Sequence, residues 1–87
     1  MARFHALIKA PDGLHARPAS ELVRLVSASG HDVQIGRLEG PKHVATSMLG
    51  ILSLGIRTGE HVEVDVTGPN EDEVAREVAA FLCNLGE

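Results

Sequence analysis

The residues best suited to chemistry lie in one short stretch of the sequence, Asp12-Gly13-Leu14-His15-Ala16-Arg17-Pro18-Ala19-Ser20. His15 stands between a glycine turn and the expected start of a helix, where free backbone N–H groups and the helix dipole favour an anion such as phosphate. Arg17 can add charge-assisted hydrogen bonds, and a histidine nitrogen can act as a nucleophile near neutral pH. The stretch therefore predicts an anion site beside a nucleophile, although a histidine at this position can equally be a surface residue or a helix cap.

The remaining histidines and the cysteine do not follow the spacing of metal ligands. Cys83 has no CxxC partner, and no pair of histidines recurs at ligand spacing. We expect these histidines to be solvated strand and loop residues: His5, His31, His43 and His61. We expect four acidic residues to form a solvated helix face: Glu71, Asp72, Glu73 and Glu77. We therefore expect no metal and no cofactor.

The elements that must position His15 follow from the spacing of apolar residues. Residues 3–10 alternate as a strand, and Pro11-Asp12-Gly13 breaks it. Helical spacing over residues 16–29, with Gly30 as a stop, predicts a helix that begins directly after His15. Pro18 falls in the first turn, where its missing N–H costs nothing.

The rest of the chain predicts three more strands and two more helices. Residues 32–38, 42–45 and 61–67 read as strands, the last with the cleanest alternation. Ser47 can cap a short helix, and Asn70 with Glu73 resembles a capping box at the start of the last helix. The order β-α-β-β-α-β-α predicts an α+β fold in which helices cover one face of a small sheet.

Composition limits the classes of function. The chain has 87 residues, which suits one small domain over residues 1–87. Its net charge of −4, with no basic run and no Trp or Tyr, argues against nucleic-acid binding. No apolar run is long enough to span a membrane, and the lone Cys83 fits a reducing cytosol. We expect a cytoplasmic monomer that does not insert into membranes.

Two motifs resemble one known family. The stretch from Gly13 to Ala19 closely resembles the active-site signature of HPr, the histidine-containing phosphocarrier of the bacterial phosphoenolpyruvate-dependent phosphotransferase system. The stretch from Ser47 to Ile56 is similar to the regulatory-serine segment of that family. The resemblance implies an open-faced β-sandwich, in which a four-stranded antiparallel sheet of order 1-4-2-3 is covered on one face by three helices.

The resemblance also implies roles for residues and partners. The Nδ1 atom of His15 is the expected phosphorylated atom, and Arg17 and the backbone N–H groups of Ala16 and Arg17 are expected to hold the phosphoryl group. The expected donor is phosphorylated enzyme I, and the expected acceptors are enzyme IIA domains of sugar permeases. By this reading the chain is a phosphoryl carrier and not an enzyme.

Ser47 and the short helix after it suggest regulation and docking. Ser47 matches the serine phosphorylated by HPr kinase/phosphorylase, and added negative charge there could hinder enzyme I. Thr46 stands where many sugar-type members have lysine. The residues expected to contribute to partner docking are Leu14, Ser20, Met48, Leu49 and Leu52. The alternative reading makes Ser47 a plain helix cap and places Met48 or Leu49 in the core.

Other interpretations stay open at this stage. The stretch from Thr67 to Glu73 also suits a carrier of the nitrogen-related branch, whereas Ser47, Gly50 and the run from Ser53 to Gly55 look sugar-type. A purely regulatory binding module is disfavoured because such relatives lack the active-site histidine. A small metal-chaperone domain is disfavoured because paired cysteines are missing. The sequence does not indicate which sugar the relay would serve.

Overall fold

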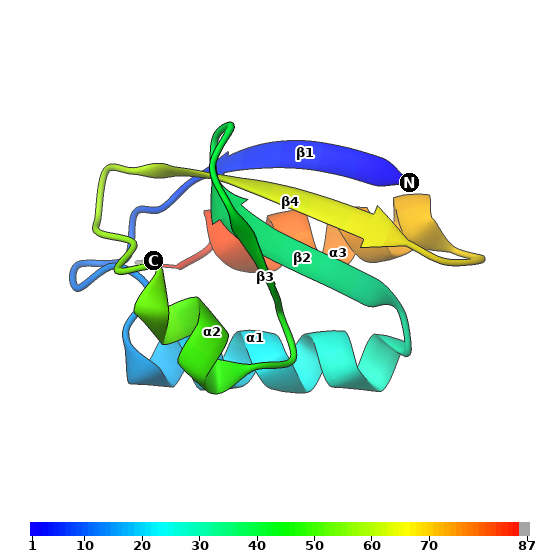
Figure 1. Cartoon of the computed structure of the whole chain (residues 1–87), viewed down its shortest axis with the longest axis horizontal. Helices are drawn as coiled ribbons and strands as arrows, with labels where there is room; N and C mark the ends of the chain where they lie inside the picture. The colour runs from blue at the N-terminus through cyan, green and yellow to red at the C-terminus, as the bar shows by residue number, and fades with distance from the viewer. Residues whose placement is uncertain (86–87) are drawn as a thin grey trace.

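The computed structural model describes residues 1–85, in which the elements follow the expected order β-α-β-β-α-β-α. They are β1 (Ala2–Leu7), α1 (Ala16–Ser29), β2 (Asp32–Arg37), β3 (Lys42–Val44), α2 (Met48–Ser53), β4 (His61–Thr67) and α3 (Glu71–Cys83). The strands form one antiparallel sheet in the order β1-β4-β2-β3. Figure 1 shows the helices on one side of this sheet, so the predicted open-faced β-sandwich is confirmed.

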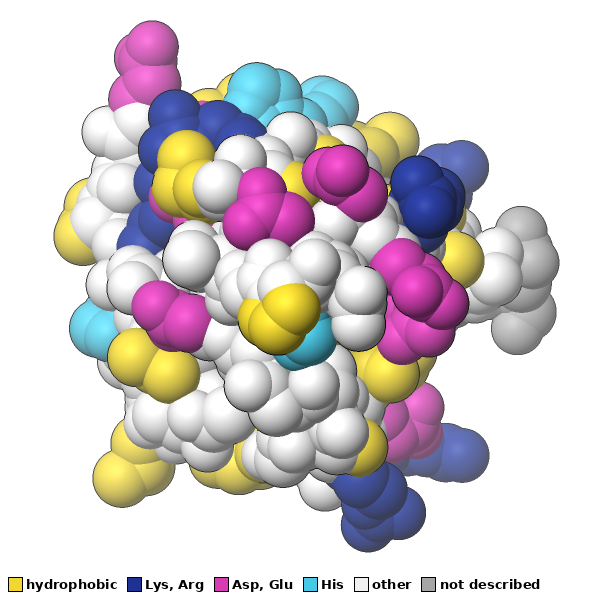
Figure 2. All heavy atoms as spheres, turned by 90° about the vertical axis from the view of Figure 1, so that its right-hand side faces the viewer, with side chains coloured by type: hydrophobic (Ala, Val, Ile, Leu, Met, Phe, Trp, Pro, Cys, Tyr) yellow, Lys and Arg dark blue, Asp and Glu magenta, His cyan; other side chains and the backbone are white. Residues whose placement is uncertain are grey.

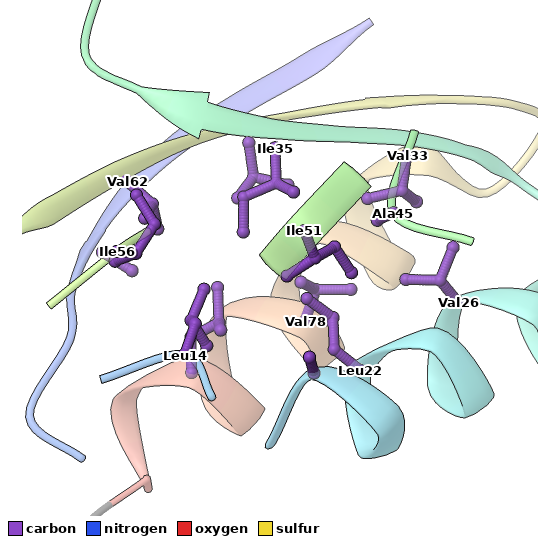
Figure 3. Packing of buried hydrophobic residues seen from close by; sticks show 14 of the residues in the cluster. Leu14, Leu22, Val26, Val33, Ile35, Ala45, Ile51, Ile56, Val62 and Val78 are labelled. Atoms are coloured by element: carbon purple, nitrogen blue, oxygen red, sulfur yellow. The ribbon is translucent and has the colours of Figure 1, made fainter. Parts of the chain in front are cut away.

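Strand β4 organises the sheet because it pairs with both β1 and β2. Phe4 lies opposite Val64 on one side of β4, and Val33 lies opposite Val66 on the other. The valines of β4 point toward the helices and are fully buried, as the alternation predicts: Val62, Val64 and Val66. Figure 3 shows Val62 and Ile35 from the sheet facing Leu22 and Val78 from the helices across the aliphatic core.

The other face of β4 carries an ion-pair cluster. Glu63 is only 6% exposed although it points away from the helices. Lys42 Nζ lies 2.7 Å from Glu63 Oε1, and His5 Nε2 lies 3.2 Å from Glu63 Oε2. Gly36, which lies opposite both Lys42 and Glu63, leaves room for Lys42 to cross β2. Figure 2 shows acidic, basic and histidine side chains interspersed over the upper part of the molecule, where the sheet lies in Figure 1.

The start of α3 differs from the predicted capping box. The Asn70 side chain makes no capping hydrogen bond, and the Asn70 N–H donates to His31 Nε2 at 3.0 Å. That amide is therefore not free for Glu73. Glu71 accepts instead from the Gly68 N–H at 3.4 Å and pairs with the Met1 ammonium at 2.7 Å. His31 is thus a half-buried link between two turns and not the solvated loop residue we expected.

Two kinds of feature are absent from the described residues, a membrane-spanning helix and a cluster of metal ligands. Among residues 1–85, no helix combines the length and apolar composition needed to cross a membrane. Within the same range, no three histidine, cysteine or acidic side chains gather where a metal ion could bind.

Candidate phosphoryl site at the start of helix α1

His15 is the N-cap residue of α1. Its backbone is extended, with φ −83° and ψ −169°, and its carbonyl accepts the first helical hydrogen bond from the Ala19 N–H at 3.0 Å. The imidazole makes no capping hydrogen bond, and 46% of the side chain is exposed. The backbone thus begins the helix while the side chain stays available to a reactant.

The first turn of α1 leaves two backbone donors beside this imidazole. The Ala16 and Arg17 amides precede the first helical hydrogen bond, and neither has a partner within residues 1–85. Pro18 has no N–H, so the third position of the turn adds no donor. The turn holds no acidic side chain to offset the positive end of the helix dipole. These groups can bind one anion without enclosing it.

The turn before His15 is fixed by a close backbone contact. Gly13 has φ +67°, and a Cβ atom there would lie 2.3 Å from the Ile56 carbonyl oxygen. That same oxygen accepts from the Leu14 N–H at 3.1 Å. The turn therefore rests directly on the segment after α2, and only glycine fits at residue 13 without a shift.

The Leu14 side chain anchors the turn in the core. Leu14 is 3% exposed and lies among the buried side chains in Figure 3. Our expectation that Leu14 contributes to a docking surface was wrong, because a side chain this buried offers almost no contact area. Burial of the Leu14 side chain in the core fixes the backbone next to His15.

Acidic side chains flank the site, and sequence reasoning did not identify them. Asp12 Oδ2 lies 4.0 Å from His15 Nε2, and Glu21 Oε1 lies 3.4 Å from Arg17 Nε. The i,i+4 spacing of Arg17 and Glu21 was the available signal. The Arg17 side chain is 85% exposed, so it can move toward an incoming anion. A cavity of about 370 Å³ opens here, lined by Ala10, Pro11, His15, Arg17, Pro18, Glu21, Asn84 and Leu85.

Helix α2 packs against α1 (Figure 1). Two of its apolar side chains are exposed. Ser47 caps α2, since its Oγ accepts from the Gly50 N–H at 3.0 Å, as predicted. Leu49 is 81% exposed and Leu52 is 37% exposed, whereas Met48 is half-buried against the core. Ser20 is exposed on α1. The α2 patch, meaning Leu49 and Leu52, is thus free to contact another protein.

The comparisons with known proteins agree with this geometry. A family model described as "PTS HPr component phosphorylation site" matches residues 2–84. The chain belongs to the HPr family. It is 47% identical over 80 residues to the phosphocarrier protein HPr of Streptomyces coelicolor, covering 87% of this chain and 86% of that protein. It is 38% identical over 74 residues to the phosphocarrier protein NPr of Escherichia coli K12, covering 85% and 81%.

Solved HPr structures share the fold. The crystal structure of HPr-C-His from Thermoanaerobacter tengcongensis superposes with a TM-score of 0.87 at 30% identity, covering 94% of this chain and 91% of that one. HPr proteins are phosphocarriers rather than enzymes that turn over a substrate, and family membership implies that this chain works with other proteins of the phosphotransferase system.

Proposed function

We propose that His15 Nδ1 accepts a phosphoryl group from phosphorylated enzyme I and passes it to enzyme IIA domains of sugar permeases. One observation carries the proposal: an exposed imidazole lies at a helix start whose Ala16 and Arg17 amides have no partner within residues 1–85. Arg17 adds a mobile positive charge at the same place. Because this cation and two amides hold the group only modestly, it can leave again.

The transfer balances without a co-reactant. The Nδ1 lone pair attacks the phosphorus, and the donor's bond to phosphorus breaks with its electron pair returning to the donor atom. The second step reverses these roles, so the acceptor's lone pair forms the new bond and Nδ1 recovers its own. His15 must present the Nδ1 lone pair to the phosphorus, and the Asp12 carboxylate lies 4.0 Å from Nε2, on the other side of the ring. Catalysis then amounts to positioning and charge neutralisation in each complex.

The α2 patch supplies the proposed docking surface together with Ser20 and the edge of Met48. Leu49 and Leu52 are exposed on a helix that packs beside α1. A small apolar surface suits a carrier, because weak interfaces let it leave each partner quickly.

Ser47 is the proposed regulatory position, with HPr kinase/phosphorylase as the modifying partner. Its hydroxyl is exposed beside the α2 patch, so a phosphate there would add about two negative charges near the docking surface. The same hydroxyl also caps α2, and the two roles are compatible. A mass-spectrometric search for phosphoserine after incubation with the kinase tests the assignment, and absence of modified Ser47 contradicts it.

The sugar branch is favoured over the nitrogen-related branch. Ser47, Gly50 and the run from Ser53 to Gly55 support it. Incubating the phosphorylated protein with enzyme IIA proteins of both branches distinguishes the two. Exclusive transfer to the nitrogen-type acceptor would overturn the sugar assignment.

The phosphorylation site itself is tested with enzyme I and labelled phosphoenolpyruvate. We expect one phosphoryl group per chain, complete loss of labelling in His15→Ala, and normal labelling in the control variant His61→Ala. His61 is exposed on β4, so the control removes an accessible histidine elsewhere. Continued labelling of His15→Ala would refute the proposal.

A further inference from the structure

The Arg37 side chain at the end of β2 makes an unusually complete set of hydrogen bonds. Its Nε donates to Glu60 Oε2 at 2.7 Å, and its Nη2 donates to Glu60 Oε1 at 3.0 Å. Its two terminal nitrogens also donate to the Leu54 and Gly55 carbonyls. We call this arrangement the Arg37–Glu60 clamp. It joins the end of α2 to the start of β4 through one side chain from β2.

The clamp also closes the loop between its two ends. Glu60 Oε1 accepts from the Arg57 N–H at 2.7 Å, and the Glu60 N–H donates to the Arg57 carbonyl at 3.1 Å. The hydrogen bonds from Arg37 and from the Arg57 amide lower the pKa of Glu60 to about 2, so the carboxylate stays charged near neutral pH. Loop 54–60 is therefore held between α2 and β4 by the Glu60 carboxylate and the Arg37 side chain.

Loop 54–60 is the surface on which the turn before His15 rests. The Ile56 carbonyl accepts from the Leu14 N–H, and Gly13 packs against Ile56 and Arg57 too closely for any other residue. The Gly59 N–H donates to the Ile8 carbonyl at 2.7 Å, which fixes the other side of the same turn. A displacement of this loop therefore moves the backbone on which the imidazole is mounted.

Building on the function proposed above, we propose that Arg37 and Glu60 are positioning residues that hold His15 and the α2 patch in a fixed relative placement. The path from the clamp to His15 consists of the Ile56 carbonyl and the Leu14 amide. The path to the patch is shorter, because Arg37 donates directly to the carbonyls of Leu54 and Gly55, the two residues that follow α2. A partner that docks on Leu49 and Leu52 thereby finds the imidazole at a set distance.

The chain offers a matched control for this clamp. Arg3 Nε lies 2.7 Å from Asp65 Oδ1 and Arg3 Nη2 lies 3.1 Å from Asp65 Oδ2, which is also a bidentate pair. That pair lies on the open face of the sheet, and within residues 1–85 no hydrogen bond or ion pair joins it to loop 54–60. Comparing Glu60→Gln with Asp65→Asn therefore separates the loss of an ion pair from the loss of this particular position.

The first measurement is amide hydrogen exchange, which does not depend on phosphoryl transfer. In Glu60→Gln we expect the Leu14 and Gly59 amides to exchange about fivefold to tenfold faster than in the parent chain, with the Val64 amide in the sheet unchanged. Asp65→Asn should leave the hydrogen exchange rate of the Leu14 amide unchanged. Arg37→Lys keeps a charge near Glu60 but loses the fork of donors, so it should also speed exchange at Leu14.

The second measurement is the rate of phosphorylation by enzyme I. The melting temperature of each variant is recorded first, and the assay is run at a temperature at which all variants are folded. We expect kcat/KM to fall about threefold to tenfold in Glu60→Gln and Arg37→Lys, and to stay at the parent value in Asp65→Asn. Unchanged Leu14 exchange in both clamp variants, or equal rate losses in Asp65→Asn, would overturn the inference. If enzyme I does not phosphorylate the parent chain, the proposed function is refuted. The amide exchange rates would still test whether the Arg37–Glu60 clamp holds the turn before His15.

Discussion

Replacing Gly13 by alanine should damage both the fold and the site, by an amount that the structure allows us to estimate. Gly13 has φ +67°, a left-handed conformation that costs an L-residue about 1–2 kcal/mol. The new Cβ would lie 2.3 Å from the Ile56 carbonyl oxygen, so the two segments must separate and weaken the Leu14–Ile56 hydrogen bond, which is worth about 0.5–1.5 kcal/mol. The two costs together predict about 1.5–3.5 kcal/mol of destabilisation.

Gly30 provides the control for this variant. It has φ +68°, yet a Cβ atom there meets nothing within 4 Å. Gly30→Ala should therefore cost only about 1–2 kcal/mol, the backbone cost alone. Urea unfolding of both variants measures the difference in stability. Phosphorylation by enzyme I should be slower in Gly13→Ala than in Gly30→Ala, because His15 moves with its turn. Equal destabilisation of the two variants would refute the close contact between Gly13 and Ile56.

Three further predictions follow from charges and exposed side chains. Because Arg37 lowers the pKa of Glu60 from 4.5 to about 2, the folded chain holds this proton less tightly than the unfolded chain, and stability should fall as the pH drops from about 4.5 toward 2. Urea midpoints over that range should decline less in Glu60→Gln, and identical declines would contradict the assignment. Leu49→Asp should change stability by no more than about 0.5 kcal/mol yet raise KM with enzyme I about tenfold, and an unchanged KM would exclude Leu49 from docking. Glu21→Gln frees Arg17 and should shift the phosphotransfer equilibrium toward the phosphorylated carrier about twofold, an effect that should vanish in an Arg17→Ala background.

The sequence correctly predicts the elements whose apolar spacing is compatible with only one type of secondary structure. Strand β4 is identified over residues 61–67 because strict alternation leaves one face for the core. Helix α1 begins at Ala16 and ends at Ser29 as predicted, since a turn precedes it and Gly30 follows it. Ser47 was correctly placed as a cap because its partner, the Gly50 amide, lies only three residues away. Local spacing sufficed in each case.

The errors concern contacts between residues far apart in the chain. The capping box at Asn70 failed because His31, 39 residues earlier, takes the amide that Glu73 needed. Leu14 was expected to contribute to partner docking, whereas it is buried and its backbone amide donates to the carbonyl of Ile56, far along the chain. The Arg37–Glu60 clamp has no local signature, since its two residues are 23 positions apart in the chain.

The starts of the helices show why His15, rather than another position, is suited to a phosphoryl group. At α2 the Ser47 hydroxyl already accepts from the Gly50 amide, and at α3 three acidic residues offset the dipole. At α1 the first turn has neither a side-chain cap nor an acidic residue, so the Ala16 and Arg17 amides, which have no partner within residues 1–85, face no competing negative group there. That arrangement weakens the isolated helix slightly, but a bound phosphoryl group would supply the missing negative charge. The cost in stability and the proposed function therefore arise from the same two amides, so a capping residue in place of His15 should stabilise α1 while it abolishes transfer.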